Sequence, residues 1–110
     1  MIASGGAGET RHLAEAYEVG AEAALIASIV HERPEGSYVV SLLDAGAAAA
    51  ARKVGEEGVE AALAGASESD ERLVEELADL WFHSYVLLAA RGLDPTAVDD
   101  ELRRRHASGG

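Results

Sequence analysis

The sequence predicts an all-α fold, a four-helix bundle completed by dimerisation. Hydrophobic residues make up 48% of the 110 residues, yet aromatic residues make up only 5%. Alanine supplies much of the apolar content, and it favours helix while burying little surface per residue. No segment shows the strict alternation of apolar and polar residues that is typical of a half-buried strand. Because alanine-rich helices leave little core in one chain, a second copy would help to complete it.

Charge and composition exclude several classes of protein. The 20 acidic and nine basic residues give a formal net charge of −11, and Lys53 is the single lysine. A nucleic-acid binder needs cations to neutralise phosphates, and an acidic membrane surface repels a protein of this charge. Without cysteine there is no disulfide framework and no thiolate chemistry. We therefore expect a cytoplasmic protein that binds neither nucleic acid nor membrane.

Proline and glycine divide the first half of the chain. The first helical pattern runs from about Arg11 to Glu32 and ends at Pro34, because the residue before a proline is displaced from the helical conformation. A second helix is expected from Ser37, which is suited to cap it, to about Ala64, where the following glycine would end it.

Three glycines lie inside the second helix, Gly46, Gly55 and Gly58. Each weakens a helix interior by about 1 kcal/mol relative to alanine. A break of the helix near Gly46 is compatible with the pattern. The other two lie among charged residues, where we expect them to permit close approach of another backbone or a ligand.

The third and fourth helices have clear start signals. The third begins after the capping residues 67–70 and ends at Gly92. The fourth has Asp94 as its N-cap and Pro95 at its first helical position, and it runs to about His106.

The predicted organisation is one domain with short ends. Residues 1–10 lack the basic region and apolar stretch of a signal peptide and are expected to form a disordered leader. Residues 11–106 form the all-α domain, and residues 107–110 form a flexible tail.

Two of these helices carry acids beside their apolar stripes. Successive residues of a helix are rotated by about 100° around its axis. On this basis the inward-facing side of the second helix carries apolar residues in its first half and acidic residues in its second half. The acids on or beside this stripe are Glu56, Glu57 and Glu60. On the third helix, Glu76 and Asp79 flank the apolar stripe, whereas Glu75 points away. The carboxylates of the two helices converge if these helices pack side by side.

Carboxylates brought together in this way repel one another unless a cation joins them. Four of them, Glu57, Glu60, Glu76 and Asp79, offer only oxygen, the ligand atom of Mg²⁺ and, alternatively, Mn²⁺. Mg²⁺ commonly recruits substrate phosphates, so a phosphorylated substrate is implied. The alternative is that these acids form a solvated face of an acidic chain.

The order of these acids is similar to a known signature. Residues 56–60, Glu-Glu-Gly-Val-Glu, followed by residues 76–79, Glu-Leu-Ala-Asp, resemble the all-α, MazG-like nucleoside triphosphate pyrophosphatases. Four segments resemble, more narrowly, the phosphoribosyl-ATP pyrophosphohydrolases of histidine biosynthesis, and the likeness extends over about residues 25 to 106. The four segments are residues 34–38, 53–57, 80–83 and 90–93.

The resemblance implies a reaction and a metal site. Such an enzyme hydrolyses 1-(5-phosphoribosyl)-ATP to 1-(5-phosphoribosyl)-AMP and pyrophosphate as a homodimer. Mg²⁺ held by Glu57, Glu60, Glu76 and Asp79 would stabilise charge on the phosphates. Glu56 is our candidate for a second metal contact or for the base that activates water, so the catalytic set is Glu56, Glu57 and Glu60.

Four further residues are candidates for substrate binding, and each also has a structural explanation. Lys53 can hold a phosphate or pair with Glu57 one turn along the helix. Ser37 can bind phosphate or only cap its helix, and Tyr38 can contact the substrate or join the core. His83 can contact substrate or be a hydrogen-bonded core residue.

Two other functions use the same features. A MazG-like enzyme acting on other nucleoside triphosphates, such as dUTP, would share the carboxylates but lack the segments around Ser37 and Lys53. An acidic helical dimerisation module would tolerate substitution of Glu57 or Asp79 without loss of function. The acidic surface itself would suit a cytoplasm rich in salt.

Overall fold

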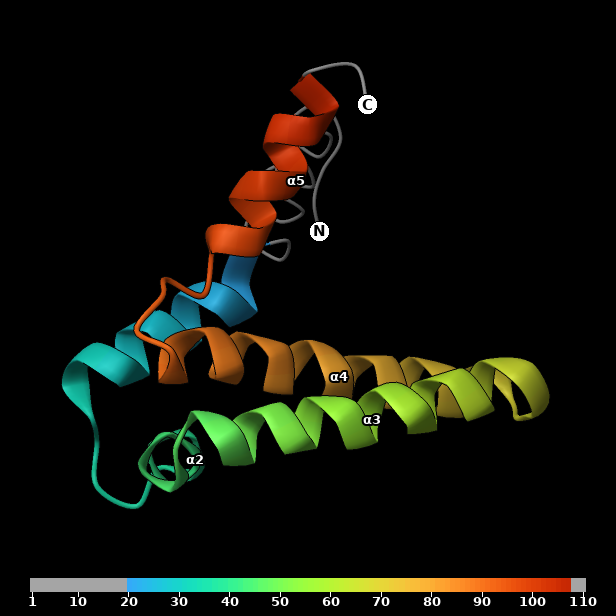
Figure 1. The fold of residues 1–110 in the computed structure, drawn as a ribbon, viewed down its shortest axis with the longest axis horizontal. Helices are drawn as coiled ribbons and strands as arrows, with labels where there is room; N and C mark the ends of the chain where they lie inside the picture. Colours follow the sequence, from blue (N-terminus) through green and yellow to red (C-terminus); the bar gives the residue numbers. More distant parts are fainter. Residues whose placement is uncertain (1–19, 108–110) are drawn as a thin grey trace, which may run out of the picture.

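The computed structural model describes residues 20–107, and every regular element in that range is a helix (Figure 1). A first helix covers residues 20–32. It is followed by α2 (Tyr38–Ala45), α3 (Ala47–Ser67), α4 (Asp70–Ala90) and α5 (Ala97–Ala107).

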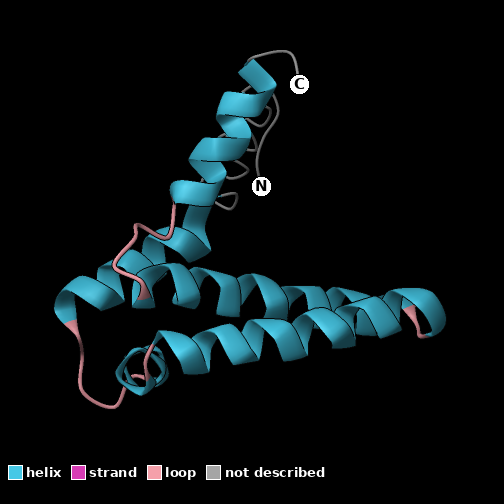
Figure 2. Cartoon of the chain, viewed as in Figure 1, coloured by secondary structure: helices cyan, strands magenta, loops and turns pink. Residues whose placement is uncertain are grey.

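The described range contains no strand, so the all-α prediction is confirmed (Figure 2). Within this range, no helix has both the length and the apolarity needed to cross a membrane. The predicted leader and the start of the first helix at Arg11 lie outside the described residues, as do residues 108–110 of the predicted tail.

The helices α3 and α4 form a long hairpin and lie side by side along their length (Figure 1). The turn between them is short because Ser69 caps α4 at once, its hydroxyl oxygen accepting from the backbone N–H of Arg72. The predicted end of α3 at Gly65 is wrong, since the helix continues to Ser67. The Glu68 N–H still donates to the Ala64 carbonyl, so a capping serine and not a glycine determines where the hairpin turns.

The expected single helix from Ser37 to about Ala64 is wrong, because it is divided in two at Gly46, the break that the sequence allowed. Gly46 has a φ of 98°, a conformation that favours glycine, and it separates α2 from α3. Ser37 caps α2 as expected, because its Oγ accepts from the backbone N–H of Val40 at 3.3 Å. The break turns α2 across the hairpin, where it contacts both α3 and α4 (Figure 1).

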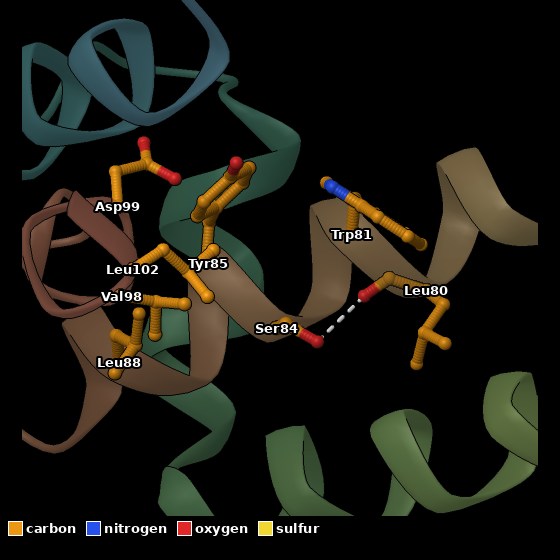
Figure 3. Close-up of a pocket in the computed structure, with 8 residues that line it drawn as sticks. All are labelled: Leu80, Trp81, Ser84, Tyr85, Leu88, Val98, Asp99 and Leu102. Carbon is orange, nitrogen blue, oxygen red and sulfur yellow. Dashed lines mark hydrogen bonds between the residues drawn. The ribbon is translucent and has the colours of Figure 1, made fainter. Parts of the chain in front are cut away.

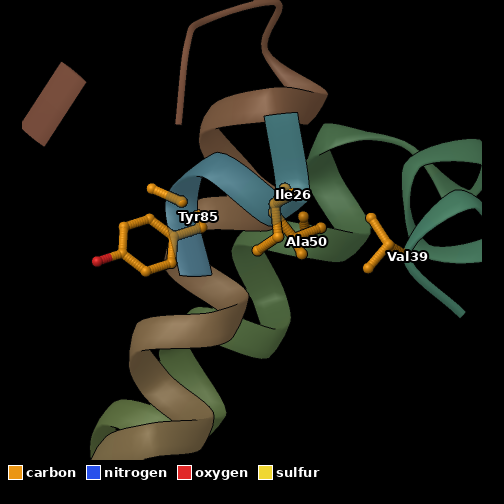
Figure 4. Packing of buried hydrophobic residues seen from close by; sticks show 6 residues of the cluster. Ile26, Val39, Ala50 and Tyr85 are labelled. Carbon is orange, nitrogen blue, oxygen red and sulfur yellow. The ribbon is translucent and has the colours of Figure 1, made fainter. Parts of the chain in front are cut away.

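The core lies where the first helix and α2 meet one end of the hairpin (Figure 4). Its fully buried large side chains are Ile26 and Val86, which are each 1% exposed. Along the rest of the hairpin the buried residues of α3 are Glu57, Ala61 and Ala64. Small side chains bring the two helices close together, and a charged residue is buried between them.

Large apolar side chains remain exposed on the hairpin. They are Val59, Leu63, Val74 and Trp81, each more than half exposed. The radius of gyration is 16.2 Å, whereas a compact chain of this length has about 13 Å. A single chain is therefore open and leaves apolar surface uncovered.

The last helix, α5, projects away from the hairpin (Figure 1). The Oδ1 of Asp94 accepts from the backbone N–H of Thr96 at 2.9 Å, a local bond of the kind a cap makes, but Asp94 lies in the turn before the helix and not at its N-cap position. The helix begins at Ala97, two residues after the predicted first position at Pro95. A mainly apolar cavity of about 290 Å³ lies between α4 and α5 (Figure 3).

Candidate metal centre

Three carboxylates from the two hairpin helices meet at one place. One oxygen from each of Glu57, Glu76 and Asp79 lies within 4.8 Å of the others. Glu57 is 7% exposed and Glu76 is 5% exposed, whereas Asp79 faces solvent. The predicted convergence of acids from the second and third helices is therefore present, and the cavity beside α5 is a separate feature.

Two of these carboxylates each have one oxygen without a partner. Oε1 of Glu57 and Oε1 of Glu76 are buried and accept no hydrogen bond. A buried acceptor left without a donor destabilises the fold, and more so when it is charged. Oxygen ligands of this kind, together with Asp79 at the solvent side, fit a hard divalent cation such as Mg²⁺ or Mn²⁺.

Glu60 lies beside the three carboxylates and affects the pKa of Glu76. Burial raises the pKa of Glu76, and the neighbouring carboxyl group of Glu60 raises it further, whereas the charge of Arg72 lowers it. Glu60 is exposed and is not a member of the group of three. Of the four predicted metal ligands, three thus converge directly and the fourth contacts one of them.

Each buried glutamate has a cation four residues before it on its own helix. The Lys53 Nζ lies 3.6 Å from Oε2 of Glu57 and 4.0 Å from Oε1 of Glu56. The pairing of Lys53 with Glu57 that the sequence allowed is present. Glu56 is half exposed at the edge of this group.

Sequence reasoning missed the second cation, Arg72. Its guanidinium donates to Oε2 of Glu76 and, at 2.7 Å, to Oε1 of Glu75, and it lies 3.5 Å from Glu68. These three acids raise its pKa, with the hydrogen bond to Glu75 as the largest cause. The signal was in the spacing, because Arg72 precedes Glu76 by the same four residues that separate Lys53 from Glu57.

His83 is buried one turn beyond Asp79 on α4. Its Nδ1 lies 2.8 Å from the backbone carbonyl oxygen of Asp79, so Nδ1 carries the proton and donates. The other ring nitrogen, Nε2, is buried without a partner. In the neutral ring Nε2 is an acceptor, and it can pair only with a group that donates.

The remaining substrate-binding candidates lie at the start of α2. Ser37 is its N-cap, and Tyr38 is its first residue and is 60% exposed. The Tyr38 ring stacks on Phe82 with centroids 6.1 Å apart, and the edge contact between Phe82 and His83 measures 5.0 Å. This row of rings connects the start of α2 with the part of α4 that follows Asp79.

Comparison with known proteins relates this chain to one enzyme family. Residues 21–106 match the family described as phosphoribosyl-ATP pyrophosphohydrolase. A protein of Metallosphaera sedula named phosphoribosyl-ATP pyrophosphatase is 53% identical over 81 residues, which cover 74% of this chain and 87% of that protein. One of the same name from Sulfurisphaera tokodaii is 46% identical over 81 residues, or 74% of this chain and 86% of that protein.

A third relative is longer. The histidine biosynthesis bifunctional protein HisIE of Xanthomonas campestris is 55% identical over 88 residues, which cover 80% of this chain and 43% of that protein. The chain thus spans less than half of the bifunctional relative. Because the family match extends over most of the chain, including all of α2, α3 and α4, the chain belongs to the phosphoribosyl-ATP pyrophosphohydrolase family.

Proposed function

We propose that this protein hydrolyses 1-(5-phosphoribosyl)-ATP to 1-(5-phosphoribosyl)-AMP and pyrophosphate, with Mg²⁺ as its cofactor and Mn²⁺ as an alternative. The observation that carries the proposal is the convergence of Glu57, Glu76 and Asp79 inside the region matched to the family. The reaction adds water across the bond between the α- and β-phosphates.

Four carboxylates would hold the metal, Glu57, Glu60, Glu76 and Asp79. A bound divalent cation supplies positive charge for the phosphate oxygens and lowers the pKa of a coordinated water. The unpaired Oε1 atoms of Glu57 and Glu76 would become ligand atoms, and the exposed Asp79 would close the site toward solvent.

Glu56 is our proposed base. Its carboxylate is half exposed and lies within reach of Lys53, which also pairs with Glu57. It would accept a proton from the water that attacks phosphorus. The side chain of Lys53 would then be free to bind a phosphate oxygen once the metal neutralises Glu57.

The substrate-binding set comprises Ser37, Tyr38, Lys53 and His83. A phosphate near the start of α2 would meet the free N–H groups of that helix beside Ser37. The half-exposed Tyr38 ring would contact the nucleoside part, and Nε2 of His83 would accept from a hydroxyl or amino group of the substrate.

We further propose that the protein acts as a homodimer in the cytoplasm. The exposed apolar side chains of the hairpin and the open shape of one chain support the dimer. A second copy that covers Val59, Leu63, Val74 and Trp81 would complete the bundle.

A substrate panel tests the proposal. Purified protein with Mg²⁺ receives phosphoribosyl-ATP, dUTP and dCTP in separate reactions, and released pyrophosphate is measured. We expect turnover of phosphoribosyl-ATP, lowered at least 100-fold in Glu57→Gln because a metal ligand is lost. Glu71→Gln, which removes an exposed acid at the start of α4, is the control and should match the unsubstituted protein.

Two results would reject this function. Fast turnover of a deoxynucleotide with none of phosphoribosyl-ATP would assign the chain to the other MazG-like activity. Equal background on all substrates for all three proteins would favour the dimerisation module.

A further inference from the structure

The two buried glutamates of the metal centre are held in the same way. A cation four residues earlier contacts Oε2 in each case, Lys53 for Glu57 and Arg72 for Glu76. In each case Oε1 is left buried and without a partner. The two helices therefore contribute glutamates in the same state. In each glutamate, one carboxylate oxygen contacts a cation and the other has no partner.

Arg72 is more than an ordinary surface ion pair. Its side chain is 51% exposed, while the Glu76 side chain that it contacts is 6% exposed. The same guanidinium also reaches the exposed acids Glu68 and Glu75. Arg72 thus extends from solvent to the buried carboxylate of Glu76.

The charges of the centre change when a metal binds. Without metal, the acids of this group are neutralised only in part, by Lys53 and Arg72. A divalent cation held by Glu57, Glu60, Glu76 and Asp79 would take over that role, and its positive charge would weaken the hold of Glu76 on the Arg72 guanidinium. The guanidinium would then be available to a polyphosphate, because its planar set of donors suits phosphate oxygens.

We propose that Arg72 neutralises Glu76 until a divalent cation binds and then contacts the pyrophosphate portion of the substrate. Arg72 is thereby a second phosphate-binding cation, in addition to Lys53. The identity of the natural substrate rests on the function proposed above, whereas the exchange of partners by Arg72 rests on the ion pairs and the unpaired oxygens.

Binding measurements on the full chain test this proposal without turnover. Mn²⁺ alone and Mn²⁺ with inorganic pyrophosphate are titrated by calorimetry into the unsubstituted protein, Arg72→Met and Arg103→Met. Arg103 pairs with Asp100 on α5, so its substitution removes the same charge at another site. For Arg72→Met we expect Mn²⁺ alone to bind about threefold more tightly. Manganese pyrophosphate should bind about tenfold more weakly. Arg103→Met should match the unsubstituted protein in both titrations.

Steady-state kinetics supply an independent readout. Arg72→Met should raise KM for phosphoribosyl-ATP about tenfold and change kcat by less than about threefold, because the lost contact is with a bound phosphate. Arg72→Lys keeps the charge but loses the planar donors. It should leave Mn²⁺ affinity unchanged and weaken pyrophosphate binding by an intermediate factor.

The outcomes separate the two proposals. If Arg72→Met leaves both titrations unchanged, or weakens the binding of Mn²⁺ alone, the role of Arg72 is rejected. If the two titrations shift in opposite directions as expected but the unsubstituted protein does not hydrolyse phosphoribosyl-ATP, the role of Arg72 stands and the proposed substrate is rejected. If Arg72→Met is unfolded, Arg72→Lys decides by its pyrophosphate affinity alone, and an affinity equal to that of the unsubstituted protein overturns the proposal.

Discussion

Which glutamates of the hairpin are buried depends on helical phase. Glu75 and Glu76 are neighbours in the sequence, yet the side chain of Glu75 is 63% exposed and that of Glu76 is 6% exposed. The periodicity of the apolar positions on α4 was sufficient to choose Glu76, because the stripe has to face α3. The burial of Glu76 toward the neighbouring helix could therefore be predicted from the sequence, whereas metal binding by Glu57, Glu60, Glu76 and Asp79 stays a prediction.

The ion pairs beside the buried glutamates were harder to predict from the sequence than the burial of the glutamates themselves. Lys53 is the single lysine of the sequence, whereas Arg72 is one arginine among several. It lies near two acids of its own helix, Glu75 and Glu76, and near Glu68 in the turn before that helix. Spacing allows Arg72 to pair with Glu68, Glu75 or Glu76, and only the packed structure shows that its guanidinium reaches all three. Which acids an arginine pairs with depends on how deeply each side chain is buried, and the amino-acid composition does not specify this.

Two substitutions of His83 test whether its Nε2 atom accepts a hydrogen bond from the substrate. Asn at this position can keep a donor near the Asp79 carbonyl, while Gln can place an acceptor near the position of Nε2. If Nε2 accepts from the substrate, His83→Asn should raise KM about tenfold with little change in melting temperature, and His83→Gln should restore part of the loss. Steady-state kinetics and thermal unfolding of both variants measure this.

The opposite pattern would contradict a substrate contact. A lower melting temperature for both variants with unchanged KM would mean that His83 only supports the fold. Loss of Mn²⁺ affinity in the absence of substrate would place its ring nitrogen on the metal.

At the scale of elements, helix ends were predicted where capping chemistry is local. Ser37 and Ser69 begin α2 and α4 because their hydroxyl oxygens accept from backbone N–H groups three residues later. The end at Gly65 was predicted wrongly, because glycine ends a helix only where the chain adopts the conformation that requires it. Gly46 has such a conformation, and the φ of Gly65 does not lie in that region.

Two glycines of α3 have no neighbour that explains them within the described chain. A Cβ placed on Gly55 or Gly58 would meet open space. The predicted close approach therefore does not occur between the described elements of one chain. A ligand or a second copy would have to supply it.

The ion pairs of α5 make its stability depend on pH. Hydrogen bonds from Arg104 and Arg105 lower the pKa of Glu101. A carboxyl whose pKa is lowered in the folded state adds stability above its ordinary pKa and loses it as pH falls through the lowered value. Glu101→Gln should therefore melt slightly lower at pH 7, by about one to two degrees, because exposed pairs contribute little.

Circular dichroism melts at two pH values check this prediction. At a pH below the range in which carboxyl groups titrate, Glu101→Gln and the unsubstituted protein should melt at the same temperature. A difference of the same size at both pH values would show that the charge of Glu101 is not the cause.

The whole molecule combines a small core with an open shape. Ile26 and Val86 are packed at one end, whereas the middle of the hairpin buries alanines and the two glutamates of the candidate centre. The excess of acidic residues first argues against a phosphate ligand. Their arrangement favours the proposed function instead, because a polyphosphate would bring the divalent cation that Glu57, Glu76 and Asp79 could bind.

The all-α class followed from composition because alanine dominates the apolar residues and no alternation was present. The number of helices and their arrangement did not follow, since the break at Gly46 and the direction of α5 depend on contacts between elements. One chain leaves apolar surface uncovered, and we propose that a second copy of the chain covers it.

Metal affinity in a matched pair of variants shows whether the buried carboxylates of the hairpin hold a divalent cation. Glu76→Gln and Glu75→Gln make the same chemical change at adjacent positions of α4, one buried in the centre and one exposed. Calorimetric titration with Mn²⁺ should show binding weakened at least tenfold in Glu76→Gln, because a charged ligand is lost, and unchanged within about twofold in Glu75→Gln. Equal affinities for Glu76→Gln and the unsubstituted protein would contradict a metal centre at this place.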